Sequence, residues 1–169
     1  MKSLQKLSFL LTVIAISPLC LANNFVVPMQ LVSSDNSGQG IGTITFTDTR
    51  NGLLITPNLT HLQPGPHGFH IHENPSCANA GEAAGGHFDP QKTGKHLGPY
   101  EKGHLGDMPV LVVDKDGNAT LPLLAPRLTT KEIEGHAIII HEGGDNYSDQ
   151  PKKLGGGGKR VACGVIYKE

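Results

Sequence analysis

The chain has 169 residues and a near-neutral charge, with 14 lysines and arginines against 15 aspartates and glutamates. This length, without an internal repeat or a break in composition, indicates one domain. A nucleic-acid-binding protein would need a basic face, and this charge balance provides none, so we expect no nucleic-acid partner.

The first 22 residues have the organisation of a secretory signal peptide. Lys2 and Lys6 give a positive start, residues 7–16 form an apolar core, and Ala22 ends a stretch suited to cleavage. The apolar run is shorter than the roughly 20 residues that a bilayer requires. We therefore expect an exported domain at 23–169 with no membrane segment in the mature form. Its 12 basic and 15 acidic residues give a net charge of −3.

The remaining chain reads as short strands with almost no helix. Segments rich in Val, Ile and Thr alternate with Gly, Asn, Asp and Ser, and residues 115–118 (Lys-Asp-Gly-Asn) are a hairpin turn signal. Only 129–134 looks helical. The expected strands are 24–33, 42–49, 53–59, 67–73, 110–114, 119–124, 135–141 and 161–168. Eight short strands at this spacing predict an all-β sandwich or barrel.

Two long connections, 74–108 and 142–159, interrupt this pattern. Structureless loops of this length are uncommon in compact domains and are usually functional or disordered. We expect both loops to be functional, and bound metal could supply the order that packing does not.

The distribution of histidine is the strongest chemical signal. Six of the nine histidines lie in four short segments, one of which also carries Asp107. They are His70, His72, His87, His96, His104 and His141. Neutral imidazole is the commonest protein ligand for transition metals, and one tetrahedral ion takes at most four ligands. The sequence therefore predicts two metal ions.

Spacing predicts how some of these ligands meet. Residues i and i+2 of a strand share a face, so His70 and His72 project together while Phe69 and Ile71 face the core. His141 ends another strand and could close the same site. The loop histidines are too far apart for one helical face, so they must converge by loop folding.

Removing the leader leaves two cysteines, Cys77 and Cys163. An even pair in an exported protein predicts one disulfide. It would close a long loop and stabilise the fold by about 4.6 kcal/mol on the chain-entropy model.

From about residue 26 to residue 169 the chain resembles the bacterial, secreted branch of the Cu,Zn superoxide dismutase family. Six motifs match in order: Gly-Phe-His-Ile-His-Glu (68–73), Ala-Gly-Gly-His-Phe-Asp-Pro (84–90), Thr-Gly-Lys-His-Leu-Gly-Pro (93–99), Gly-His-Leu-Gly-Asp-Met-Pro (103–109), Ile-His-Glu-Gly-Gly-Asp-Asn (140–146) and Arg-Val-Ala-Cys-Gly-Val-Ile (160–166). The resemblance implies an eight-stranded Greek-key β-sandwich, closed like a flattened barrel, with two long functional loops.

The resemblance also implies one copper and one zinc ion per subunit. The implied copper ligands are His70, His72, His87 and His141. The implied zinc ligands are His87, His96, His104 and Asp107. His87 would bridge the two ions. Four imidazoles suit Cu(II), and three imidazoles with a carboxylate suit a closed tetrahedral zinc site.

The implied activity is dismutation of superoxide to dioxygen and hydrogen peroxide, an antioxidant function in the periplasm. In this mechanism copper is reduced and reoxidised, and His87 takes up a proton in one half-reaction and releases it in the other. Arg160 would orient the anion, and Asp145 would hydrogen-bond one histidine of each metal site. The Cys77–Cys163 disulfide would brace the loop that positions Arg160.

Two rival functions fit parts of the sequence. A non-catalytic copper-delivery or zinc-storage module with this fold would be expected to lack a copper ligand or Arg160, and all are present. A two-metal hydrolase would prefer bridging carboxylates, whereas the sequence offers one aspartate and a shared imidazole. The sequence leaves monomer and homodimer both open, together with the identity of any lysines that steer the substrate.

Overall fold

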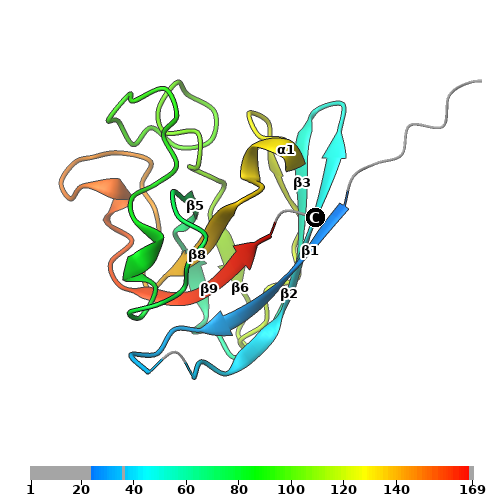
Figure 1. Ribbon diagram of the computed structural model, residues 1–169. Helices are drawn as coiled ribbons and strands as arrows, with labels where there is room; N and C mark the ends of the chain where they lie inside the picture. Colours follow the sequence, from blue (N-terminus) through cyan, green and yellow to red (C-terminus); the bar gives the residue numbers. More distant parts are fainter. Residues whose placement is uncertain (1–23, 36, 168–169) are drawn as a thin grey trace, which may run out of the picture.

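A computed structural model describes residues 24–35 and 37–167. The expected signal peptide at 1–22 lies outside these residues. Within them the regular secondary structure is almost entirely β-strand, with one α-helical turn and two 3-10 turns (Figure 1). None of the helices in this part of the chain has the length and hydrophobicity of a membrane-spanning helix.

Seven strands form one strongly curled antiparallel sheet, in the order β5-β8-β9-β1-β2-β3-β7. Their bounds are β1 Asn24–Leu31, β2 Gly40–Thr49, β3 Gly52–Leu59, β5 Phe69–His72, β7 Leu123–Ala125, β8 His136–His141 and β9 Arg160–Ile166. A two-stranded sheet pairs β4 (Gly65–His67) with β6 (Leu111–Val113). Because β9 returns by a long connection to lie beside β1, the order β9-β1-β2-β3 is a Greek key. The predicted fold class is confirmed.

The expected strand at 67–73 is divided at Gly68, because the chain changes partner there. β4 pairs with β6, whereas β5 pairs with β8. Gly68 itself bonds to the second loop, since its N–H donates to the carbonyl of Gly143 at 2.7 Å. The expected strand 119–124 is also shorter at its start, because β7 begins at Leu123. Pro122 has no N–H to donate to a neighbouring strand.

The core lies inside the curled sheet and follows the alternation of the strands. Ile44 and Phe46 of β2 and Leu53 and Ile55 of β3 are completely buried. In contrast, all four residues of β5 are buried, on both faces of the strand. One face packs into the core, so the other must be covered by the loops.

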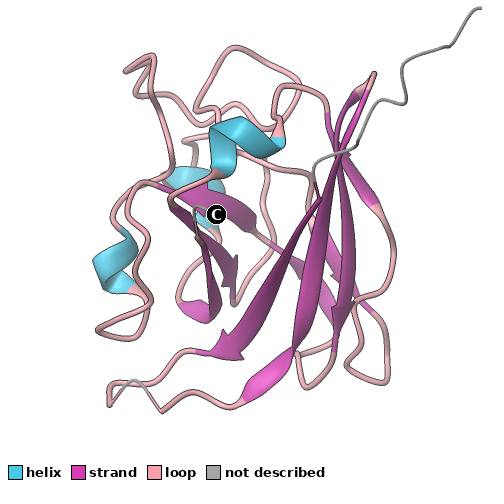
Figure 2. Cartoon of the chain, turned by 45° about the vertical axis from the view of Figure 1, so that its right-hand side comes forward, coloured by secondary structure: helices cyan, strands magenta, loops and turns pink. Residues whose placement is uncertain are grey.

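The helical turn α1 (Thr130–Ile133) confirms the predicted helical segment. Its entrance is capped by Glu132, whose Oε2 accepts hydrogen bonds from the N–H and hydroxyl of Thr129. The remaining turns are η1 (Glu82–Ala84) and η2 (Leu154–Gly156), one in each long loop. Figures 1 and 2 show both loops gathered on the side of the molecule that carries β5 and β8.

Candidate metal centre

Two of the predicted metal ligands, His70 and His72, lie on one face of β5. Their ring centroids are 6.3 Å apart. The intervening residues Phe69 and Ile71 are completely buried in the main core. Strand alternation therefore places both imidazoles on one face of β5, as the sequence predicted, with their planes tilted by 52°.

Backbone hydrogen bonds bring His87 and Asp107 to the same strand. Ile71 of β5 donates to the carbonyl of Gly106 and accepts from the N–H of Phe88, both at 2.9 Å. Gly106 in turn donates to the carbonyl of Phe88 at 2.9 Å. A Cβ atom at Gly106 would lie 2.3 Å from the Ile71 oxygen, so the approach requires glycine. Two loop segments 18 residues apart are thus bonded to β5 and to each other.

His141 reaches the same place from the end of β8. Its N–H donates to the carbonyl of Gly68 at 2.8 Å, and its own carbonyl accepts from Nδ1 of His67 at 2.6 Å. The register of β8 against β9 shifts between Ile140 and His141, which places His141 opposite Arg160. His67 therefore holds the strand end that carries His141.

A first group of four buried histidines has its ligand atoms within 4.8 Å of one another: His70, His72, His87 and His141. In three of them one ring nitrogen donates to a protein oxygen. His70 donates to Asp145 at 2.7 Å, His72 to the Gly85 carbonyl at 3.0 Å, and His141 to the Gly158 carbonyl at 3.2 Å. These bonds fix the tautomer and leave the lone pair of the second nitrogen free.

A second group contains His87, His96 and Asp107 together with His70. The sequence predicted His104 as its fourth member in place of His70. His104 is 7% exposed, and its Nδ1 lies 3.4 Å from Oδ1 of Asp107. His70 has only one free nitrogen and already belongs to the first group. Because His70 cannot serve both groups, we assign His104 as the fourth ligand of the second group.

Asp145 connects the two groups. Its carboxylate accepts from Nε2 of His70 at 2.7 Å and from Nε2 of His96 at 2.8 Å, and its side chain is completely buried. Gly155, at a φ of 72°, packs against it, because a Cβ there would lie 1.9 Å from Oδ1 of Asp145. The predicted contact of Asp145 with one histidine of each set is therefore present.

The electrostatics of the cluster favour neutral imidazoles in the first group. Burial lowers the pKa of His70 to about 3 and that of His141 to about 4, and it also lowers the pKa values of His72 and His87. In the second group burial is outweighed by the adjacent carboxylates of Asp107 and Asp145, which raise the pKa of His96 to about 9. The neighbouring imidazoles, His104 first and then His87 and His96, hold the pKa of Asp107 well below its usual range against the effect of burial. The cluster thus combines free imidazole lone pairs with two carboxylate charges.

The unpaired polar atoms test whether metal ions fit this cluster. Among the described residues, eight buried side-chain nitrogen or oxygen atoms have no hydrogen-bond partner, and seven of them belong to the cluster. They are Nδ1 of His70, His96 and His104, Nε2 of His72, His87 and His141, and Oδ2 of Asp107. Leaving a buried polar group unsatisfied costs about 1–3 kcal/mol, so such a concentration needs a common partner. Cations at the two groups would satisfy it, and the residues fit two metals.

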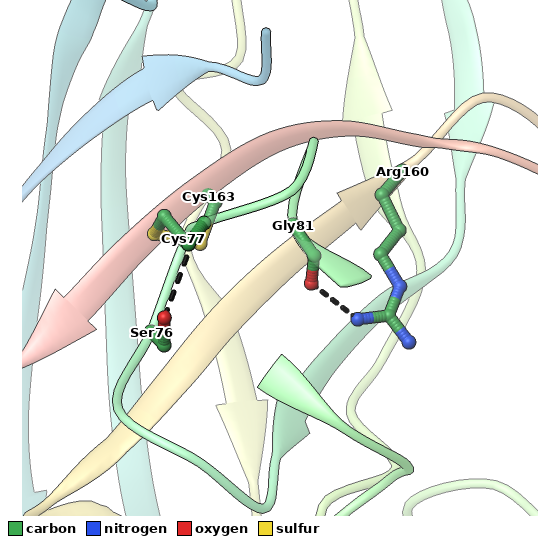
Figure 3. The surroundings of a disulfide bond; sticks show 6 residues. Ser76, Cys77, Gly81, Arg160 and Cys163 are labelled. Atoms are coloured by element: carbon green, nitrogen blue, oxygen red, sulfur yellow. Dashed lines mark hydrogen bonds between the residues drawn. A yellow bond between two sulfur atoms is a disulfide. The ribbon is translucent and has the colours of Figure 1, made fainter. Parts of the chain in front are cut away.

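Arg160 stands beside the first group at the start of β9. Its guanidinium donates through Nη1 to the carbonyl of Gly81 and through Nη2 to the carbonyl of Gly85. The predicted disulfide joins Cys77 to Cys163, with a Cα–Cα distance of 5.7 Å. Figure 3 shows the loop from Cys77 to Gly81 running from the disulfide to the guanidinium. The disulfide therefore anchors the segment that holds Arg160.

Two contacts between the long loops had no signal in the sequence. The carboxylate of Asp149 accepts from the backbone N–H of His96 at 3.0 Å. The hydroxyl of Tyr147 accepts from the N–H of Val110 at 2.9 Å. Both contacts involve backbone groups, and backbone partners leave no residue pattern to find. The first contact holds the second loop against the segment that carries His96, and the second holds it against the residue before β6.

A cavity of about 300 Å³ opens beside His141. Its wall is formed by Lys152, Lys153 and Leu154, with residues 156–158. Both lysines are exposed. Lys95 and Lys159 do not line this cavity. A small anion could therefore approach His141 past two positive charges.

The three remaining histidines lie outside both groups. His61 is exposed and contacts the hydroxyl of Thr60 at 2.7 Å. His136 donates to the carbonyl of Glu73 at 2.8 Å. His67 holds the carbonyl of His141, as described above. This division agrees with the one made from sequence.

A curled Greek-key sheet whose two loops enclose adjoining groups of metal-binding side chains defines a two-metal β-protein. The family model described as copper/zinc superoxide dismutase matches residues 41–166. The chain belongs to the copper/zinc superoxide dismutase family.

Named relatives agree with this assignment. The chain is 58% identical over 149 residues to superoxide dismutase [Cu-Zn] 2 of Salmonella typhimurium strain LT2, covering 83% of this chain and 86% of the relative. The Cu/Zn superoxide dismutase from Brucella abortus superposes with a TM-score of 0.81 at 44% identity, covering 85% of this chain and 99% of the other. The monomeric copper, zinc superoxide dismutase from Salmonella enterica gives a TM-score of 0.76 at 56% identity, with the same coverage.

The family fixes the overall chemistry. The protein is an oxidoreductase that dismutes superoxide, and its cofactors are copper and zinc.

Proposed function

We propose that each chain holds one copper and one zinc ion, divided between the two groups. Copper is assigned to His70, His72, His87 and His141, and zinc to His87, His96, His104 and Asp107. The observation that carries this division is the set of unpaired buried nitrogens, because it offers one free donor atom from every assigned histidine. Four imidazole nitrogens suit Cu(II), and three imidazoles with a carboxylate suit tetrahedral zinc.

His87 is the shared ligand in this proposal. His87 belongs to both groups: its Nε2 has no protein partner, while its Nδ1 lies 2.9 Å from Oδ1 of Asp107, a member of the second group. An imidazole between two cations can give up both ring protons. His87 is therefore the residue that can hold one transferable proton at Nε2 while the second group fixes its ring.

The reaction consumes two superoxide anions and two protons and yields one dioxygen and one hydrogen peroxide. Copper held by His70, His72, His87 and His141 would supply the one-electron couple that both half-reactions need. The residues of the chain then have three tasks. Arg160 attracts and orients the anion, Nε2 of His87 holds one of the two protons, and Asp145 keeps His70 and His96 in the correct tautomers.

The fork geometry of Arg160 supports its assigned role. Two backbone carbonyls, those of Gly81 and Gly85, hold the guanidinium in place without neutralising its charge. Its nearest carboxylate, that of the exposed Glu82, contacts Nε at 3.6 Å. A fixed cation beside the copper-binding histidines favours an anionic substrate over neutral molecules of the same size.

We further propose that residues 1–22 are a signal peptide and that the mature enzyme at 23–169 acts in the bacterial periplasm, with no membrane association. The Cys77–Cys163 disulfide supports an oxidising compartment. The Salmonella enterica relative is described as monomeric, and we propose the same state for this chain. Light scattering of the purified mature protein tests that state, and a stable dimer would contradict it.

Metal analysis combined with one ligand variant tests the central proposal. The wild-type protein, loaded with both metals, is expected to contain about one copper and one zinc per chain and to consume superoxide. His141→Ala should lose copper and superoxide consumption while keeping zinc, because His141 belongs only to the first group. His61→Ala, at an exposed histidine outside both groups, is the matched control and should keep both metals. Equal loss of zinc and copper in His141→Ala would contradict the division.

A further inference from the structure

A single arginine outside both metal groups holds the loop segment that carries His104. Arg127 follows β7, in a turn with Pro126. The neighbouring residues Ala125 and Leu128 are 2% and 1% exposed and belong to the main core. The backbone of Arg127 is therefore fixed to the barrel, while its side chain extends to the first long loop.

The guanidinium donates to three backbone carbonyls of that loop. Nη1 contacts the carbonyls of Glu101 and His104, the latter at 3.3 Å, and Nη2 contacts the carbonyl of Gly103 at 3.0 Å. Residues 101–104 form neither helix nor strand. Within the described residues, these three carbonyls accept no other hydrogen bond. Arg127 thus supplies the hydrogen-bond donors that a helix or a neighbouring strand would otherwise provide to these carbonyls.

The clamped segment packs directly against the segment that carries His96. The N–H of His104 donates to the carbonyl of Lys95 at 2.9 Å. A Cβ at Gly103 would lie 2.6 Å from the Lys95 oxygen and 2.9 Å from the backbone nitrogen of Leu97. His104 is therefore held by Lys95 on one side and by Arg127 on the other. A shift of either support would move its Nδ1 away from Asp107.

Arg127 forms no ion pair with a carboxylate in the described part of the chain. Its contacts are all to carbonyl oxygens, so its role depends on the directions of its N–H groups. A planar guanidinium presents several donors in a fixed fork, whereas a lysine ammonium is one compact point charge on a flexible stem. Lysine at this position could keep the charge and could not span the three carbonyls.

We propose that Arg127 is a positioning residue for the zinc-binding half of the site, and that it holds His104 in place before the metal arrives. This inference rests on the proposed assignment of His104 to zinc. It implies that zinc affinity depends on Arg127 although no atom of Arg127 touches the metal.

The test compares zinc and copper affinity in metal-free protein. Arg127→Gln is expected to weaken zinc binding by about 10–100-fold in a chelator competition, the usual effect of losing a group that orients a metal ligand. Copper affinity should stay at the wild-type value, because Arg127 contacts no member of the first group. Arg50→Gln is the matched control, since Arg50 is an exposed arginine in the turn between β2 and β3.

Two further readouts separate positioning from a general loss of stability. Cobalt(II) bound in place of zinc should show altered visible absorption bands in Arg127→Gln, because a displaced His104 changes the ligand geometry. A merely structural role would weaken copper and zinc binding together. Arg127→Lys should bind zinc with an affinity between those of the wild type and Arg127→Gln, and this variant decides the matter if Arg127→Gln does not fold.

Wild-type zinc affinity and an unchanged cobalt spectrum in the folded variants would overturn the inference. His104→Ala separates this failure from failure of the ligand assignment. If His104→Ala keeps zinc, His104 is not a ligand and both proposals fall. If His104→Ala loses zinc while the Arg127 variants keep it, only the role of Arg127 is refuted.

Discussion

His72 and Arg160 donate hydrogen bonds to the same atom, the carbonyl oxygen of Gly85, at 3.0 and 2.6 Å. One imidazole of the first metal group and the cation beside it are therefore fixed to one peptide unit. The bond to Nδ1 leaves Nε2 of His72 free toward the metal group. The Gly85 carbonyl thus orients both a metal-binding imidazole and the proposed anion-binding guanidinium.

Replacement of Arg160 tests whether its guanidinium attracts and orients the superoxide anion. Arg160→Gln is expected to lower the second-order rate constant for superoxide by about tenfold at low ionic strength, because the fixed positive charge is removed. Arg160→Lys should retain part of the rate, since an ammonium keeps the charge and cannot contact both carbonyls in the same way. Pulse radiolysis on protein loaded with both metals measures the rate.

The control for Arg160 is metal content. Copper and zinc should remain near one per chain in both variants, because Arg160 contributes no atom to either group. A wild-type rate for Arg160→Gln at every ionic strength would refute the proposed role.

Two glycines with similar backbone conformations provide a test of the contact with Asp145. Gly155 has φ 72° and its Cβ would collide with Asp145, whereas Gly94 has φ 62° and nothing lies within 4 Å of its Cβ position. Alanine at either site incurs left-handed strain of about 1–2 kcal/mol. Only Gly155→Ala should add a further ~1–3 kcal/mol of overpacking. Denaturant unfolding of the metal-free variants measures the difference.

Metal binding by Gly155→Ala and Gly94→Ala distinguishes backbone strain, which both variants share, from displacement of Asp145, which only the first should cause. Gly155→Ala is expected to weaken both copper and zinc binding, because Asp145 bonds to one histidine in each group. Gly94→Ala should bind both metals normally. Equal metal affinities in the two variants would show that Asp145 tolerates the shift.

Lys152 and Lys153 are the lysines that we expect to steer the substrate, since they line the cavity beside His141. In water a charge about 10 Å from the anion contributes about 0.4 kcal/mol, or about twofold in rate. Replacement of both lysines by glutamine should therefore slow the reaction about fourfold at low ionic strength. The effect should disappear at high salt, where the charges are screened. Lys115→Gln, in the exposed turn after β6, is the control, and an equal loss there would assign the effect to net charge alone.

Loss of the disulfide should mainly lower the free energy of unfolding of the protein. Cys77→Ala combined with Cys163→Ala is expected to lower the free energy of unfolding by about 2–5 kcal/mol, because the unfolded chain gains the freedom of an 86-residue loop. Activity should fall as well, since the freed segment includes Gly81, a partner of Arg160. A change in stability below about 1 kcal/mol would contradict this expectation.

The strand pattern and the choice of metal-binding side chains could be predicted because both have local signatures. His70 and His72 share a face through simple strand alternation, and the number of remaining histidines required a second group. Their convergence depends on loop backbone, which the sequence does not encode in side-chain types. The hydrogen bonds of Ile71 to Gly106 and Phe88 are of this kind.

The same reason explains what sequence reasoning missed. The contacts of Asp149, Tyr147 and Arg127 all end on backbone N–H or carbonyl groups, so only one partner of each pair is visible as a residue. The break at Gly68 was missed because a change of strand partner leaves the alternating pattern on both sides intact.

The bonds from Ile71 to the first loop have a further consequence for β5, which is an outermost strand of the seven-stranded sheet. An open strand edge is a template for pairing with another chain, and proteins usually protect it with charges, proline or a covering segment. β5 has the sequence Phe-His-Ile-His, and its cover is the chain around Phe88 and Gly106. That cover is the same stretch that carries His87 and Asp107. The loop that carries metal-binding residues therefore also occupies the outer edge of β5, where another chain could otherwise pair.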